Sequence, residues 1–162
     1  MTNPRILHLH STFDLGGKEA RAVRLMNAFG DDFGHDIVSA VPSATAAMDA
    51  VEPGIDARLL TDFPPLAGRP APARLKRLAT AIGGGGYALV LSYNFGAMDA
   101  VLARRLWGNT PLIHHEDGFN QDERDRQKPA RVLYRRLALP GTAALVVPSQ
   151  LLEQVALRVW KQ

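Results

Sequence analysis

One stretch near the start of the chain, residues 5–29, constrains the fold more than any other. An apolar run interrupted by two histidines covers residues 5–10, a loop ending in Gly16 and Gly17 follows, and apolar residues then recur with helical spacing. This order predicts a buried strand, a tight turn and a helix. Such a junction directs backbone N–H groups and the positive end of a helix dipole out of one edge of a sheet. We therefore expect any site to face that edge.

The remainder of the chain repeats this alternation of strand and helix. Apolar runs predict further strands at residues 36–41, 57–60, 88–92, 111–115 and 143–147. Apolar stripes with helical spacing predict helices that cover residues 75–82, 98–106, 129–139 and 149–159. Residues 44–51 are a further candidate helix, and the proline-rich residues 61–73 are typical of a loop. The pattern predicts an α/β fold, a Rossmann-like three-layer domain with a mostly parallel sheet of about six or seven strands and helices on both faces.

Polar residues follow the carboxyl ends of four predicted strands, where parallel sheets of this kind bind ligands. The candidates for substrate binding at this edge are Gly16, Gly17, Lys18, Tyr93, Asn94, His114 and Ser149. The glycine pair lacks the G-x-G-x-x-G spacing of a dinucleotide site and the Gly-Lys-Ser/Thr ending of a P-loop. It predicts either a tight turn alone or an anion site at the helix start. Ser149 also has a purely structural explanation, as the N-cap of the last helix.

Four consecutive residues from His114 to Asp117 invite a metal-site interpretation. Adjacent strand residues point to opposite faces, so His114 and His115 cannot easily share one metal ion. We therefore expect no metal site, with one histidine packing inward and the other facing the cleft. His8 and His10 share one face of the first strand and are expected either to pack in the core or to support a site from behind, near the strand end.

The composition narrows the function classes. Of 162 residues, 46% are hydrophobic and 22% charged, and none is cysteine, so a disulfide framework and cysteine-based metal or redox chemistry are excluded. The formal charge of +3 does not require a nucleic-acid partner. With no basic and apolar leader before the first strand and no apolar stretch of membrane-spanning length, we expect a cytoplasmic protein. Basic residues at 69–77 and 131–136, and Arg21 on the first helix, are expected to be solvated, although the two clusters permit peripheral contact with the inner face of a membrane.

Three segments together resemble the amino-terminal domain of family 4 glycosyltransferases, which have the GT-B fold. They are HLHSTFDLGGKEARAVRL at 8–25, PLIHHEDGFNQDERDRQ at 111–127 and ALVVPSQLLEQVA at 144–156. The glycine pair ahead of the first helix, the histidine after the fifth strand and the V-V-P-S opening of a late helix follow the family's order. The resemblance covers most of the chain.

The resemblance implies that residues 1–162 are the single acceptor-side domain of a retaining glycosyltransferase of hexosyltransferase type. Such an enzyme moves a sugar from a nucleotide-sugar to a glycan, lipid or small-molecule acceptor. The carboxy-terminal half that holds the donor in this family is absent, so we expect the chain alone to be inactive. By resemblance His115 lies beside the transferred sugar, and Glu116 and Asp117 are the other candidate catalytic residues. The family generally needs no metal, and no cofactor is implied.

Two other functions stay open at this point. One is a stand-alone flavodoxin-like domain that binds a phosphorylated ligand, and the other is a non-catalytic subunit of a split transferase. A domain that lacks its partner half exposes an apolar surface facing the cleft, so we expect self-association or low stability. The sequence leaves the donor, the acceptor and the general base unassigned.

Overall fold

The computed structural model describes residues 3–118, 123 and 127–162. Within them, six strands form one sheet in the order β3-β2-β1-β4-β5-β6, and every neighbouring pair is parallel. The strands are β1 (Arg5–His10), β2 (Gly34–Ser39), β3 (Ala57–Leu59), β4 (Leu89–Tyr93), β5 (Leu112–His115) and β6 (Ala144–Val146). This is the strand order of doubly wound dinucleotide-binding domains, which bind ligands where the order reverses. The expected α/β class is confirmed, and the reversal lies between β1 and β4.

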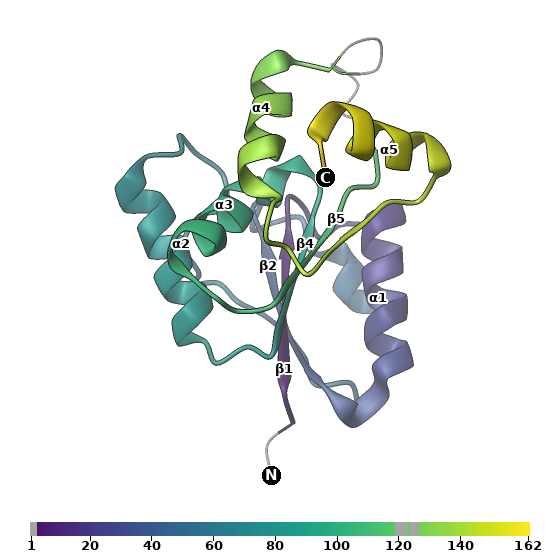
Figure 1. The fold of residues 1–162 in the computed structure, drawn as a ribbon. Helices are drawn as coiled ribbons and strands as arrows, with labels where there is room; N and C mark the ends of the chain where they lie inside the picture. Colours follow the sequence, from purple (N-terminus) through teal and green to yellow (C-terminus); the bar gives the residue numbers. More distant parts are fainter. Residues whose placement is uncertain (1–2, 119–122, 124–126) are drawn as a thin grey trace.

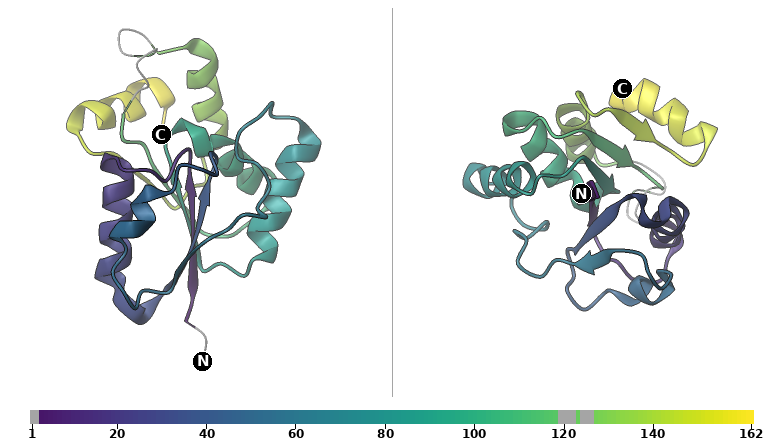
Figure 2. Two further views of the ribbon diagram at one scale, coloured as in Figure 1. Left: turned by 180° about the vertical axis from the view of Figure 1, so that it is seen from behind. Right: turned by 90° about the horizontal axis from the view of Figure 1, so that it is seen from below.

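Helices cover both faces of the sheet, as Figure 1 and Figure 2 show. The longer helices are α1 (Gly17–Phe29), α2 (Pro72–Gly84), α3 (Met98–Trp107) and α4 (Pro129–Ala138), and α5 (Gln150–Val155) continues as the π-helical η5 (Ala156–Trp160). Short 3-10 helices are η1 (Gly30–Asp32), η2 (Ala46–Ala50) and η3 (Phe95–Ala97). Helix α1 packs on one face, whereas α2 and α3 pack on the other. The predicted three layers are therefore present.

The alternation of side chains along β1 divides the hydrophobic core in two. Leu7 and Leu9 are fully buried in the cluster that contains α2 and α3. Ile6 points the other way and packs in a second cluster with Val23 and Met26 of α1. A parallel sheet of this kind is buried on both faces. Register is strongly specified, because a shift by one residue would exchange the two faces.

Helix ends follow the signals that the sequence carries. Gly30, with a φ of 58°, ends α1, and its N–H donates to the carbonyls of Met26 and Asn27. Oγ of Ser149 accepts from the N–H of Leu152 at 3.3 Å and caps α5. The N-cap expected at Ser149 is thus present.

Strand β2 begins and ends earlier than the predicted 36–41. Gly34 joins the strand, and a Cβ at this position would collide with the guanidinium of Arg5. At the other end, Oγ of Ser39 donates to the carbonyl of Val41 at 2.7 Å, which turns the chain away from the sheet. The strand limits are therefore set by a neighbouring side chain and a local turn, not by the apolar run.

None of the helices in the described part of the chain combines the length and apolar character needed to cross a membrane. The segment that follows β5, at residues 116–127, lies partly outside the described residues, at 119–122 and 124–126. Its described members are the residues next to β5, Glu123 and Gln127.

Candidate functional site

The glycine pair lies at the start of α1, on the carboxyl edge of the sheet. Gly16 is the N-cap, in an extended conformation, and Gly17 is the first helical residue; both are exposed. The N–H of Ala20 donates to the carbonyl of Gly16, so the N–H groups ahead of it in the first turn have no acceptor within the helix. Together with the helix dipole, these groups make the junction suited to an anion.

Two charged side chains of the first turn already pair with each other at this junction. Nζ of Lys18 forms an ion pair with Oε1 of Glu19 and donates to the carbonyl of Thr12 at 2.9 Å. Glu19 is buried and also accepts from the hydroxyl of Thr12 at 3.1 Å. A Cβ at Gly16 would lie 2.7 Å from Oε2 of Glu19, so the carboxylate covers the N-cap. The predicted anion site is bordered by one fixed positive and one fixed negative charge.

Arg21, one turn along α1, connects this junction to the end of β5. Its guanidinium forms a two-pronged ion pair with Asp117, with Nη1–Oδ1 at 2.7 Å and Nη2–Oδ2 at 3.0 Å. Nη2 also lies 3.2 Å from Nδ1 of His115. The expectation that Arg21 is simply solvated is therefore wrong, because its partners come from a distant strand end. The structure brings two of the three candidate catalytic residues, His115 and Asp117, together with α1.

The contact with Arg21 determines which nitrogen of His115 carries the proton. A guanidinium only donates, so Nδ1 of His115 accepts and the ring proton lies on Nε2. Burial, and then the positive charge of Arg21, lowers the pKa of His115 to about 4. At neutral pH His115 is therefore uncharged and donates a hydrogen bond through Nε2. The lone pair on Nδ1 already accepts from Arg21.

Asn94 holds the backbone on which Asp117 lies. It follows β4 with a φ of 57° and a ψ of −179°, a backbone conformation that residues with a side chain rarely adopt. Its N–H donates to the carbonyl of His115 at 2.7 Å, and its Oδ1 accepts from the N–H of Asp117 at 2.7 Å. Nearby, Gly96 leaves the space that the side chain of Ser11 occupies. Asn94, a predicted substrate-binding residue, thus joins the ends of β4 and β5.

A stack of rings lies beneath His115 in the core. The ring of Tyr93 lies between those of His10 and His115, at centroid distances of 4.0 and 4.8 Å. Tyr93 is fully buried, and its hydroxyl lies 3.3 Å from Nδ1 of His8. Burial lowers the pKa of His8 to about 3 and lowers that of His10 well below its usual value. Tyr93 therefore supports His115 from below, and His8 and His10 are buried in the core.

His114 and Glu116 lie on the opposite face of the sheet, toward α4, and both are fully buried. Nδ1 of His114 lies 2.8 Å from Oγ of Ser92, and Oε2 of Glu116 accepts from Nε of Arg135 at 3.0 Å. Burial opposes ionisation of Glu116, but its neighbours His114 and Arg135 outweigh this effect and keep the pKa of the carboxyl below its usual range. These two predicted site residues lie under the site rather than on its surface.

The alternation along β5 separates the two adjacent histidines, as the sequence predicts. His115 packs on Tyr93, whereas His114 contacts Ser92 from the other face. Among the described residues, no group of three or more histidine and acidic side chains comes close enough together to hold a metal ion.

Ser149 lies at the rim of the sheet, after the edge strand β6. It lines an open hollow of about 460 Å³ together with Val147 and Pro148. Its hydroxyl is used in the helix cap. Strand β5 lies between β6 and β4, so Ser149 is set apart from the junction at the switch point.

Three basic residues that were expected to be solvated pair with carboxylates, so the expectation is wrong for them. Arg135 is only 1% exposed and pairs with Glu116. Arg131 pairs with Glu123 at 2.8 Å. Arg74 pairs with Asp99, and its side chain is 11% exposed. No local sequence pattern identifies these pairs, because each acidic partner lies outside the helix that carries the arginine.

The fold is shared with solved glycosyltransferases. The crystal structure of a glycosyltransferase from Rickettsia africae aligns with a TM-score of 0.63 at 13% identity, over 99% of this chain and 41% of that one. A sucrose-phosphate synthase from Thermosynechococcus elongatus aligns with a TM-score of 0.53 at 16% identity, over 96% of this chain and 82% of that one. No protein-family model matches the chain, and no curated protein sequence does. At these identities the likeness establishes the shared α/β fold alone, and the chain spans less than half of the Rickettsia africae protein.

Proposed function

We propose that this chain is the acceptor-side domain of a retaining, family 4-like glycosyltransferase that uses a nucleotide-sugar donor. The observation that carries the proposal is the convergence of α1, through Arg21, on His115 and Asp117 at the switch point of the sheet. The fold shared with a glycosyltransferase and a sucrose-phosphate synthase supports it. A stand-alone domain for a phosphorylated ligand is the alternative that the experiment below separates from it.

The chemistry of sugar transfer matches the groups at this junction. Breaking the bond to a nucleotide diphosphate builds negative charge on the leaving group and positive charge on the sugar. In the proposed enzyme, the N–H groups of Gly17 and Lys18 stabilise the leaving diphosphate. The Nε2–H of His115 donates to a hydroxyl of the transferred sugar, and the carboxylate of Asp117 lies near the developing positive charge. Glu116 acts from below by holding the same segment through Arg135.

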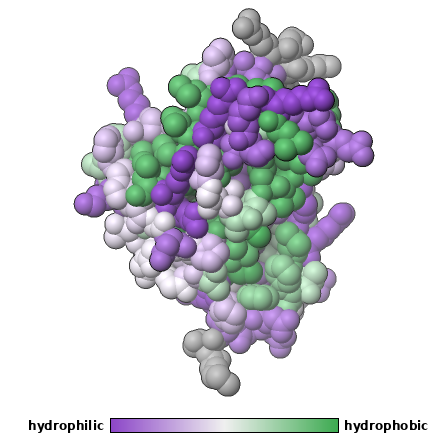
Figure 3. All heavy atoms as spheres, in the orientation of Figure 1, coloured by the Kyte–Doolittle hydropathy of each residue, from purple (hydrophilic) through white to green (hydrophobic). Residues whose placement is uncertain are grey.

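We propose further that a second domain completes the site and holds most of the donor. The chain spans 41% of the Rickettsia africae glycosyltransferase. Large apolar side chains on α4, α5 and η5 are at least half exposed, and Figure 3 shows hydrophobic residues gathered in patches between hydrophilic ones. The exposed leucines of this region are Leu133, Leu137, Leu151 and Leu157. We expect the chain alone to be inactive and to self-associate through such surface.

Amide NMR titrations of the chain test the proposal. The ligands, added in separate titrations, are uridine diphosphate glucose, guanosine diphosphate glucose and adenosine diphosphate glucose. Weak, saturable shifts are expected at Gly17, Lys18 and Glu19 with one of the donors. The bare nucleosides, which lack the diphosphate, are the controls and should leave these signals in place. If no donor shifts the start of α1, the proposal fails. Micromolar affinity without any transfer in the presence of acceptors would instead favour the stand-alone binding domain.

A further inference from the structure

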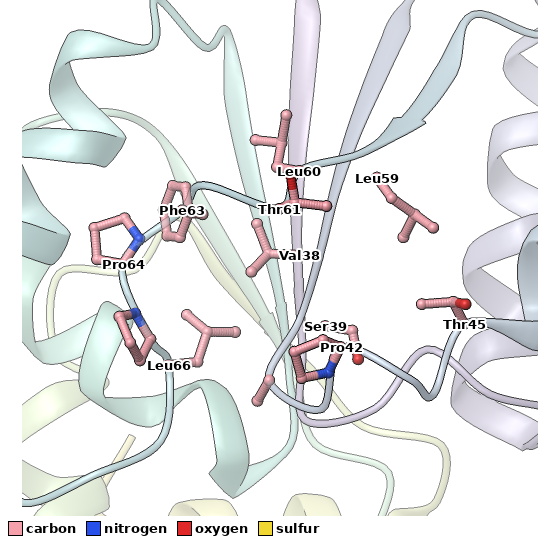
Figure 4. A pocket seen from close by; sticks show the side chains of 12 residues that line it. Val38, Ser39, Pro42, Thr45, Leu59, Leu60, Thr61, Phe63, Pro64 and Leu66 are labelled. Carbon is pink, nitrogen blue, oxygen red and sulfur yellow. The ribbon is translucent and has the colours of Figure 1, made fainter.

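A pocket of about 280 Å³ opens at the carboxyl ends of β2 and β3. None of the residues that line it belongs to the site described above. Figure 4 shows the side chains of Val38, Phe63, Pro64 and Leu66 grouped around one hollow, between the end of β2 and the proline-rich segment. The pocket therefore lies on the edge of the sheet where ligands bind in folds of this class.

The lining of the pocket is apolar and uncharged. Among the described residues that line it, none carries a charge, and the polar side chains are the hydroxyls of Ser39, Thr45 and Thr61. The Ser39 hydroxyl already has partners, with Oγ at 2.7 Å from the carbonyl of Val41 and 3.1 Å from that of Ala44. A charged ligand would lose its hydration here without gaining a counter-ion. An apolar cavity of about 150 Å³ holds benzene, so this pocket has room for a substituted ring.

One arginine holds the wall of this pocket in place. Nη1 of Arg74 donates to the carbonyls of Pro65 at 2.9 Å and Leu66 at 3.1 Å, and its Nε donates to that of Arg69 at 3.0 Å. The same guanidinium is paired with Asp99 on α3. Because these carbonyls all rest on one anchored side chain, the wall is formed before a ligand arrives. A preformed wall lowers the entropic cost of binding.

Backbone hydrogen bonds join the other wall of the pocket to the proposed transfer site. The N–H of Ala40 donates to the carbonyl of His10 at 2.9 Å. The N–H of Phe13 donates to the carbonyl of Ala44 at 2.9 Å. The segment that carries Ala40 and Ala44 therefore runs beside the end of β1 and beside the loop that leads to the glycine pair. The pocket, which Ala40, Pro42 and Thr45 line, and the loop that leads to the glycine pair therefore share this segment as a border.

We propose that this pocket binds the uncharged, apolar part of the acceptor, and that the acceptor hydroxyl faces the start of α1. The inference rests on the proposed function and names its acceptor class: an alcohol that carries an aromatic ring or a compact aliphatic group. Phosphorylated and carboxylated acceptors are rejected at this pocket. Arg74 is a positioning residue for it, since its guanidinium holds the wall and does not line the cavity.

Amide NMR titrations with benzyl alcohol and with 4-(hydroxymethyl)benzoate test the inference, since the two probes differ only in one carboxylate. Benzyl alcohol is expected to shift the signals of Val38, Leu60 and Phe63 saturably, and the benzoate to bind at least about tenfold more weakly. Thr61 is exposed at the rim, so Thr61→Lys should fold normally and reduce this preference by offering a counter-ion. Arg74→Gln should weaken benzyl alcohol binding, whereas Arg77→Gln, on the exposed side of α2, should not.

Equal affinity for the two probes, or shifts confined to other parts of the chain, would overturn the inference. Failure of the proposed function gives a different result in the same sample. In that case, benzyl alcohol fills the pocket while no nucleotide-sugar shifts Gly17 to Glu19. If instead the donors shift α1 and the pocket stays empty, the transferase proposal stands and the acceptor class is wrong.

Discussion

Nε of Arg135 donates to Oε2 of Glu116 at 3.0 Å, and each of these two side chains is 1% exposed. The guanidinium also lies over the rings of Phe95 and Trp160, at 5.0 and 4.8 Å from their centroids. The pair therefore joins α4 and the carboxy-terminal helix to the residue that follows His115. On the opposite face Arg21 joins α1 to Asp117. The segment from His115 to Asp117 is held by an arginine from each side.

Arg135→Met should lower the free energy of unfolding by about 3–5 kcal/mol, because it leaves the Glu116 carboxylate buried without its counter-ion. Urea denaturation at pH 7 measures the loss. Arg77→Met, on an exposed surface of α2, is the control and should change the free energy of unfolding by less than about 0.5 kcal/mol. Adding Glu116→Gln to Arg135→Met should recover part of the loss; an equal or larger loss in the double variant would contradict the buried charge as its cause.

Arg21→Gln should raise the pKa of His115 from about 4 toward its usual value. The positive charge of Arg21 disfavours the imidazolium, so its removal favours protonation, while burial still keeps the pKa below about 6.5. The pH dependence of the His115 ring signals in NMR reports the change. Arg24→Gln, at an exposed position on the same helix, is the control and should leave the pKa of His115 unchanged. An unchanged titration in Arg21→Gln would mean that burial alone sets the pKa.

Gly17→Ala should abolish the donor-induced shifts at the start of α1 without destabilising the chain. A Cβ at Gly17 meets no atom within 4 Å, and alanine has the higher helix propensity, so unfolding should need equal or higher denaturant. The methyl group would occupy the space through which a diphosphate approaches the N–H groups. Gly83→Ala in α2, where a Cβ is equally unobstructed, is the matched control. Donor shifts that survive in Gly17→Ala would contradict binding at this turn.

Stability should fall as the pH drops from about 6.5 toward 4. All five histidines are buried, and burial lowers the pKa of His8 to about 3 and that of His115 to about 4. Over this range the unfolded chain binds protons that the folded chain does not, so each such histidine contributes a slope of about 1.4 kcal/mol per pH unit. Above pH 6.5 these histidines are neutral in both the folded and the unfolded chain, so their slope disappears and the full stability is kept. Urea denaturation at a series of pH values measures the slope.

His10→Phe should reduce this slope by about 1.4 kcal/mol per pH unit and raise stability at pH 5. Within the described part of the chain neither ring nitrogen of His10 has a hydrogen-bond partner, and its ring stacks on Tyr93 at 4.0 Å. Phenylalanine keeps the stack and buries no polar atom. A slope equal to that of the parent chain would show that His10 does not take up the proton on unfolding.

The order of strands and helices could be predicted because it depends on local signals. Periodicity located β1, β4 and β5, and glycine and serine marked the ends of α1 and α5. The limits of β2 could not be predicted from such local signals, since they depend on the side chain of Arg5 and on a turn after Ser39. The separation of His114 from His115 followed from strand alternation alone.

The charged part of the site could not be predicted from local sequence. Arg21 and Arg135 occupy positions that look solvated in a helical projection, yet their partners lie 96 and 19 residues away. Such pairs form only when the sheet order brings two distant segments together. Glu19, which covers the N-cap of α1, was missed for a different reason, because an acidic residue in a first helical turn is common for its dipole interaction alone.

The place of β1 at the centre of the sheet has a consequence for synthesis of the chain. β1 leaves the ribosome before the other five described strands, but one of its two hydrogen-bonding edges stays open until β4, at Leu89–Tyr93, has been made. Sheets closed by such distant pairings fold slowly and expose strand edges to other chains meanwhile. Arg21 likewise cannot form its ion pair until Asp117, 96 residues later in the chain, has been made. Nascent chains that stop before β5 should therefore depend on chaperones more than the finished domain does.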